Sequence, residues 1–107
     1  MFSFDKLCEA SQMRILIVAK NNSDYARIVG YYIGLSFPKL KSEIKNKVLE
    51  VVIANPVFAI EFGKGIKNVL ENLDEESREK LMSLAKINQY LYTLDPKFIT
   101  PKIIQGS

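Results

Sequence analysis

Few residues of this chain could carry out chemistry, and histidine is missing altogether. Without histidine there is no Ser–His or Cys–His nucleophile pair, and no imidazole can act as a general acid or base. The one cysteine, Cys8, can form neither an internal disulfide nor a thiolate metal site alone. It falls on the apolar side of an expected helix, so we predict a small buried side chain rather than a reactive thiol.

Three other motifs imitate functional sites, and each has a simpler explanation. The acidic cluster over 74–79 resembles a metal site, but acids are also favoured where a helix begins. Gly63-Lys64-Gly65 lacks the spacing of a phosphate-binding P-loop and follows no expected strand. Glu43-Ile44-Lys45, with Asp24 as a distant partner, has a spacing found in strand-based nuclease sites, whereas a helix is expected here. We therefore predict a protein that is not an enzyme and has no metal, cofactor or small-molecule substrate.

Length and composition favour one ordinary globular domain. The chain has 107 residues, of which 48% are hydrophobic and 25% are charged, and its net charge of +3 is only mildly basic. No apolar run approaches the ~20 residues that a membrane span needs, and no signal-peptide pattern is present. Together with the single cysteine, these features predict a cytoplasmic protein, or a viral one made in the host cytoplasm, without membrane contact.

Helical spacing of apolar residues predicts five helices, over about 5–19, 24–35, 38–54, 56–72 and 75–92. The β-branched run over 15–19 could instead be a strand, but no second strand-like segment exists to pair with it. The predicted fold is all-α, a compact bundle of four to five helices with an extended C-terminal arm. Residues 1–92 form the bundle and residues 93–107 the arm.

Capping residues and apolar stripes give more detailed expectations for these helices. The expected N-caps are Ser3, Ser23, Asn55 and Asp74, and Pro38 suits the first turn of the third helix. A kink or break is expected in the fourth helix, where two glycines, at 63 and 65, weaken it. The expected buried stripes of the first three helices comprise Phe4, Leu7, Cys8, Ile15 and Val18; Tyr25, Ile28, Val29, Tyr32 and Leu35; and Leu40, Ile44, Val48, Val51 and Val52.

The second expected helix also carries a ridge of small residues, formed by Ala26, Gly30 and Gly34. The ridge lies nearly opposite the apolar stripe, so this helix needs cover on more than one side. Either the ridge packs against neighbouring helices of the same bundle, or a second copy or another protein covers it. Tyr31, beside Arg27 on the flank of the ridge, is of a residue type common in interface hot spots.

The C-terminal arm is too apolar to be a free linker, because it contains Phe98, Ile99, Ile103 and Ile104. Two outcomes are open: these side chains fold back onto the bundle, or they bind another subunit. Together with the ridge and Tyr31, they form the predicted partner interface.

Lysine and arginine residues suggest an alternative partner. Arg27, Lys41 and Lys45 are candidates for phosphate contact, although the lysines of this region also flank a buried stripe as snorkelling side chains do. The predicted function is a non-catalytic protein–protein interaction module that self-associates or serves as a subunit. The alternative is a helical subunit that contacts DNA or RNA; in size and helicity alone the chain is similar to the small subunits of CRISPR effector complexes.

Overall fold

The structure, a computed structural model, describes residues 3–94, and helices account for nearly all of this range. The five α-helices are α1 (Glu9–Asn21), α2 (Ser23–Ser36), α3 (Ser42–Ala54), α4 (Pro56–Lys67) and α5 (Glu75–Ile87). Short 3-10 helices are η1 (Phe4–Lys6), η2 (Phe37–Lys39), η3 (Leu70–Asn72) and η4 (Gln89–Leu94). No strand occurs within residues 3–94, so the all-α prediction is confirmed, and residues 15–19 are helical.

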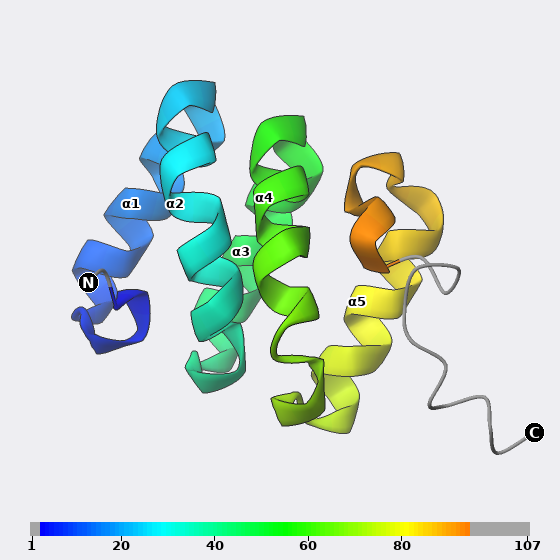
Figure 1. Ribbon diagram of the computed structural model, residues 1–107. Coiled ribbons are helices and arrows are strands. Elements are labelled where there is room, and N and C mark those ends of the chain that lie inside the picture. Colours follow the sequence, from blue (N-terminus) through cyan, green and yellow to red (C-terminus); the bar gives the residue numbers. More distant parts are fainter. Residues whose placement is uncertain (1–2, 95–107) are drawn as a thin grey trace, which may run out of the picture.

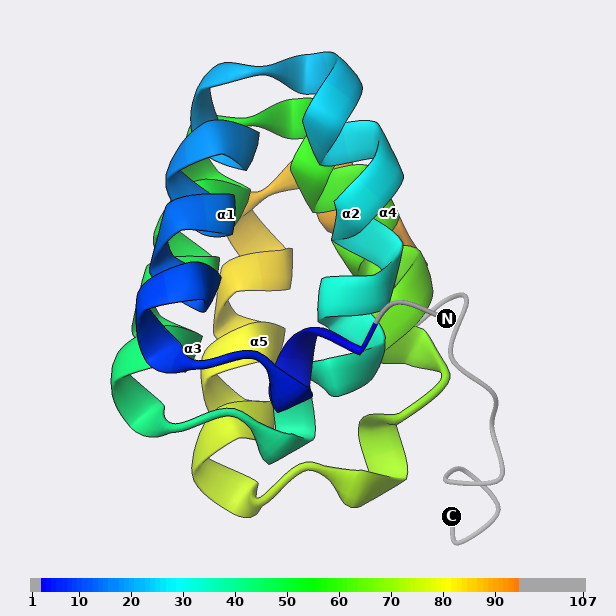
Figure 2. The ribbon, with the colours of Figure 1, turned by 90° about the vertical axis from the view of Figure 1, so that its left-hand side faces the viewer.

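The helices lie in two layers, which two perpendicular views show (Figures 1 and 2). One layer contains α1, α3 and α5, and the other contains α2, α4 and the short η4. Successive elements alternate between the layers because short connections make neighbouring helices antiparallel. The result is a row of helical hairpins, with α1 and α2 at one end and α5 and η4 at the other.

The closest packing in the molecule is between the backbones of α2 and α4, and glycine makes it possible. A Cβ atom at Gly34 would lie 2.5 Å from the carbonyl oxygen of Phe62 and 2.9 Å from the amide nitrogen of Ile66. A Cβ atom at Gly65 would collide with the carbonyl oxygen of Tyr31. Only residues without a side chain allow two helices this separation, so the small ridge of α2 packs against α4 within the chain.

Three phenylalanine side chains pack beside this contact. Phe62 stacks on Phe58 with ring centroids 6.0 Å apart and meets the edge of Phe37 at 5.4 Å. All three rings are buried, together with Ile33 of α2 and Ile66 of α4. Such pairs add about 0.5–1.5 kcal/mol each to the free energy gained by burying their area.

Asn55 connects the two layers through its buried side chain. Its Oδ1 accepts hydrogen bonds from the backbone amides of Val57 and Phe58, at 3.0 and 3.2 Å, and so caps α4. Its Nδ2 donates to the carbonyl oxygens of Ala19 and Lys20 at the end of α1, at 3.0 and 3.3 Å. One side chain therefore satisfies backbone groups at the start of one helix and at the end of another.

Several sequence predictions about the elements are confirmed. Asn55 and Asp74 cap α4 and α5, and Asp74 accepts a hydrogen bond from the backbone amide of Ser77 at 2.8 Å. The predicted stripe of the third helix is buried in full: Leu40, Ile44, Val48, Val51 and Val52. Leu81 of α5 is also buried.

The start of the first helix was predicted wrongly. Phe4 lies in η1, and α1 begins only at Glu9 after an extended break at Leu7 and Cys8. The break turns the helix so that Gln12, Leu16 and Ala19 become its buried residues, and Cys8 and Val18 are exposed. The side-chain amide of Gln12 donates to the carbonyl oxygen of Phe4 at 2.9 Å, and this hydrogen bond holds η1 against α1. Ser3 makes no side-chain capping bond.

The second helix also faces the core differently from the prediction. Of the expected stripe only Val29 is buried, whereas Ile28 is 66% exposed and Tyr32 is 39% exposed. The small ridge takes the buried position because it allows the close contact with α4. Its N-cap is Asn22, which accepts a hydrogen bond from the amide of Tyr25, and not Ser23.

The ends of the later helices differ from the predictions too. Pro38 lies in η2, and α3 begins at Ser42. No break interrupts α4 at Gly63 or Gly65, because packing on α2 offsets the weak helix propensity of glycine; the helix ends at Lys67 rather than Asn72. The fifth helix ends at Ile87 rather than at Tyr92, and η4 follows it over Gln89–Leu94. Leu94 is fully buried.

Among the residues that the structure describes, none of the helices has both the length and the apolar character needed to cross a bilayer.

The glycine contact yields a graded prediction for substitution by alanine. The destabilisation should follow the order Gly65→Ala, Gly34→Ala, Gly30→Ala, because Cβ atoms at Gly65 and Gly34 would overlap backbone atoms, whereas a Cβ atom at Gly30 meets the Cβ of Glu61 at 2.9 Å and its nearest backbone atom only at 3.3 Å. We expect Gly65→Ala to lower the free energy of unfolding by about 1–3 kcal/mol, measured by urea denaturation, as overpacking does. Gly30→Ala should destabilise least of the three, because a gain of about 1 kcal/mol in helix propensity offsets part of the cost of moving the Glu61 Cβ, which cannot shift without its backbone. Lys64→Ala, at an exposed position of α4, is the control; equal effects at the three glycines would contradict the close approach.

Asn55 yields a second prediction, which separates its two roles. Aspartate caps helices as well as asparagine does, so Asn55→Asp keeps the cap of α4 but loses the two donors to the end of α1. We expect the variant to lower the free energy of unfolding by at least about 1–3 kcal/mol, because buried carbonyl oxygens lose their donors and face a buried carboxylate instead. The reverse exchange, Asp74→Asn, is the matched control and should change stability much less. If the two exchanges have equal effects, the bond from Asn55 to α1 contributes nothing.

Candidate protein-binding surfaces

The predicted ridge interface is not available to a partner. Ala26, Gly30 and Gly34 are all buried, and α4 of the same chain covers the two glycines. Tyr31 is half-buried, its carbonyl oxygen faces Gly65, and its hydroxyl accepts a hydrogen bond from Asn68 at 3.5 Å. The first of the two alternatives therefore holds for the ridge: its cover is intramolecular.

The other part of the predicted interface lies outside the described residues. Phe98, Ile99, Ile103 and Ile104 all follow Leu94, where the described part of the chain ends. Their placement in the predicted interface stays a prediction.

The three candidate phosphate contacts are not brought together. Arg27 lies in the first half of α2 and Lys41 lies directly before α3, and these two segments are at opposite ends of the molecule (Figure 2). Arg27 pairs with Asp24 at 3.2 Å, and Lys41 lies 3.7 Å from a carboxylate oxygen of Glu9.

Lys45 has a role inside the fold. Its side chain is only 14% exposed, lies 3.7 Å from Asp74 and donates a hydrogen bond to the Ser77 hydroxyl at 3.0 Å. Its ammonium group also lies 5.6 Å from the centre of the Phe37 ring, within the range of a cation–π interaction. These contacts attach α3 to the start of α5, so they give no support to phosphate binding by Lys45, and the nucleic-acid alternative stays an untested prediction.

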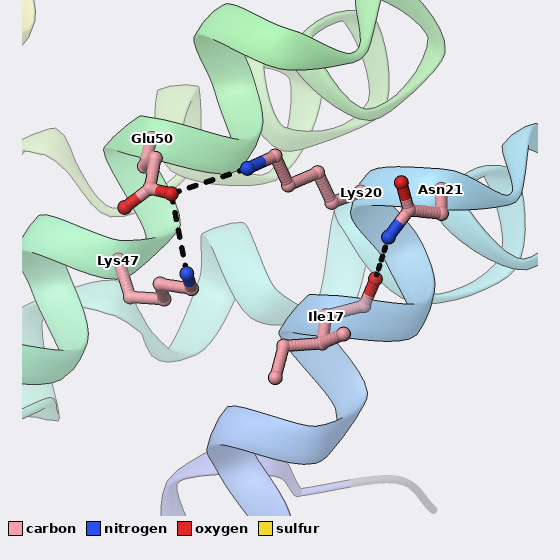
Figure 3. Close-up of polar contacts among 5 residues, drawn as sticks. All are labelled: Ile17, Lys20, Asn21, Lys47 and Glu50. Carbon is pink, nitrogen blue, oxygen red and sulfur yellow. Dashed lines mark hydrogen bonds and ion pairs between the residues drawn. The ribbon is translucent and has the colours of Figure 1, made fainter.

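Basic residues on the opposite side of α3 are also paired. Figure 3 shows Glu50 accepting contacts from Lys20 of α1 and Lys47 of α3, each at 3.2 Å. Hydrogen bonds from Lys47 and then from Lys20 lower the pKa of the Glu50 carboxyl below its usual value. Near the same helix end, the Asn21 amide donates to the carbonyl oxygen of Ile17 at 3.0 Å. This cluster aligns α1 with α3, and its two lysines share the one carboxylate.

A surface that sequence reasoning missed lies at the α1–α2 end of the row of hairpins, the end that faces the viewer in Figure 2. Val18 on α1 is 41% exposed, Ile28 on α2 is 66% exposed, and Leu7 before α1 is also exposed. We call these three residues, with the partly exposed Tyr32, the end face. The sequence did signal them as large apolar residues at helical spacing, but their pattern could not tell an inward side from an outward one.

A second missed surface is an open groove between α3 and α5. It has a volume of about 510 Å³ and is lined by residues of both helices, chiefly Leu49, Ile53, Glu76, Glu79, Leu84 and Ile87. Ile53 is 67% exposed and Ile87 is 83% exposed. At the other end of the groove, Glu76 pairs with Lys80 at 3.4 Å, whereas Glu79 makes no ion pair with any described residue. The groove therefore combines an apolar end with an acidic one.

Within residues 3–94, the motifs that could carry out chemistry lie inside helices or at a helix start. Within residues 3–94, no group of three or more cysteine, aspartate or glutamate side chains could hold a metal ion. The acidic cluster opens α5, where Asp74 acts as a cap, and Gly63-Lys64-Gly65 lies inside α4. Glu43-Ile44-Lys45 is helical, Ile44 is buried, and Asp24 is paired with Arg27.

Cys8 departs from the prediction of a buried thiol. It is exposed at the N-cap position of α1, and its sulfur lies 3.4 Å from the hydroxyl of Ser11. Hydrogen bonding by the Ser11 side chain, followed by the Ser11 backbone amide, lowers the pKa of the thiol. The wrong prediction followed from extending the first helix back across the break at Leu7 and Cys8.

Comparison of the chain with family models, with curated proteins and with solved structures found no match.

The setting of Cys8 predicts its reactivity. A thiol-specific reagent should label Cys8 in the folded full-length chain without denaturant, because the sulfur is exposed and its thiolate is stabilised. Ser11→Ala removes the largest contribution to the lowered pKa, so the profile of labelling rate against pH should move to higher pH. Ser83→Ala, an exposed change on α5, is the control. A profile that is the same for both variants would mean that Ser11 does not act on the thiol.

Proposed function

We propose that this protein is a protein–protein interaction module that associates with a second copy of itself through the end face. The observation that carries the proposal is the apolar character of Leu7, Val18 and Ile28 at the open end of a row of packed helices. In proteins built from stacked helical units, each unit covers the next, and the outermost unit usually needs a polar outer face to stay soluble. Here the outermost helices present large aliphatic side chains instead.

Geometry supports a second copy as the partner. The end face is formed by two adjacent helices, and a helical layer packs naturally onto another layer of the same kind. Two copies related by a two-fold axis would each bury the same residues, as in most small homo-oligomers. Arg27 pairs with Asp24 within the chain at 3.2 Å, so this pair leaves no net charge beside Ile28.

Association should therefore be apolar and insensitive to salt. We expect the full-length chain to form a dimer whose population rises with concentration, measured by light scattering and sedimentation. Val18→Lys combined with Ile28→Lys should weaken the association about thirtyfold or more, as loss of interface hot spots does. Both residues are exposed, so the changes leave the core intact.

The matched control is Ile87→Lys, which makes the same kind of change at the opposite end of the row of hairpins. It should leave the dimer unchanged. A full-length chain that stays monomeric at high concentration would overturn the proposal, as would a dimer that both lysine variants weaken equally.

A further inference from the structure

We propose that the groove between α3 and α5 is a binding site for an apolar segment carrying a lysine, and that residues 95–107 of the same chain are its ligand. This inference concerns a different surface from the end face and does not depend on self-association. Three observations carry it: the chemistry of the groove, the sequence after Leu94, and the distance that this sequence can span.

The residues that line the groove favour a ligand with both apolar groups and a cation. The apolar end of the groove is formed by aliphatic side chains, and Ile53 and Ile87 face solvent over most of their surface. Glu79 adds a carboxylate that has no ion-pair partner among the described residues. A segment that covered the isoleucines and placed a cation beside Glu79 would satisfy both parts of the groove.

The sequence after Leu94 has this chemistry twice. Residues 96–100 read Pro-Lys-Phe-Ile-Thr and residues 101–105 read Pro-Lys-Ile-Ile-Gln, so each five-residue unit places two apolar residues directly after a lysine. A proline in each unit disfavours helix and favours an extended chain. Extended segments present alternate side chains to a groove, which suits a slot between two helices.

The distances allow binding within one chain. Leu94 ends η4, which lies in the layer of α4, whereas the groove lies between helices of the other layer (Figure 1). A chain that passes around half the circumference of α5, a helix about 10–12 Å in diameter, covers about 16–19 Å. The ten residues from Leu94 to Ile104 span up to about 33 Å, so the second unit reaches the groove with length to spare.

Because residues 95–107 are covalently joined to the chain that carries the groove, binding within one chain is favoured over binding to a second copy. A ligand joined to its site by a short linker has an effective concentration of the order of millimolar, which exceeds ordinary protein concentrations. Residues 95–107, the tail, therefore occupy the groove of their own chain and cover Ile53 and Ile87. A segment of another protein with similar chemistry would have to displace the tail before it could bind.

A single tryptophan tests this, because the natural sequence contains none. Ile104→Trp in the full-length chain should give blue-shifted emission and protection from acrylamide, because residue 104 shares a face with Lys102 in an extended segment. Adding Ile53→Lys and Ile87→Lys should raise the quenching constant severalfold and shift the emission to that of an exposed tryptophan. Both isoleucines are exposed, and far-ultraviolet circular dichroism checks that the fold persists. Ile28→Lys, the same change on the end face, should leave the tryptophan protected.

Each other outcome overturns the inference. A tryptophan that is fully quenchable in the parent chain shows that the tail is not bound. Protection that survives the groove substitutions places the tail elsewhere. Protection that disappears on dilution in the background of Val18→Lys combined with Ile28→Lys, where end-face pairing is weakened, means that a second copy supplies the tail. Failure of the end-face dimer alone leaves the tryptophan signal unchanged, so the two proposals fail independently.

Discussion

The rest of the fold depends on how closely the backbones of α2 and α4 approach each other. Gly34 and Gly65 bring main-chain atoms of one helix against those of the other, leaving no room for a side chain between them. This contact sets the rotation of α2 about its own axis, because the small ridge has to face α4. Once the ridge faces inward, Ile28 must face outward, so the end face is a direct result of the glycine contact.

The predictable part of the fold was the part determined by local chemistry. Asn55-Pro56 and Asp74 could be identified as helix starts because their side chains bond to amides within the next few residues. The stripe of α3 was found because Ile44, Val48, Val51 and Val52 recur at helical spacing and are all buried. In these cases sequence distance and spatial distance are nearly the same, and a pattern can be interpreted without knowing the neighbours.

The parts that were predicted wrongly depended on long-range packing. In α2 both sides are apolar, so the periodicity allowed two rotations, and only the contact with Gly65 decides between them. In the first helix, the break at Leu7 and Cys8 allows Phe4 to enter the core and Gln12 to bond to its carbonyl oxygen. The candidate surfaces were missed for the same reason: the end face follows from the rotation of α2, and the groove from the separation of α3 and α5, neither of which appears in a linear pattern.

Asn55 has a consequence for the order in which the molecule opens and closes. The acceptor side of its amide bonds to residues two and three positions away, whereas the donor side reaches carbonyl oxygens 35 and 36 positions away. The cap of α4 can therefore form in a chain where α1 is still detached, and it survives if α1 transiently separates. When α1 separates, the Nδ2 group of Asn55 loses its two acceptors, but the cap of α4 remains. We therefore expect α1 to open as a unit while α2 and α4 stay packed together.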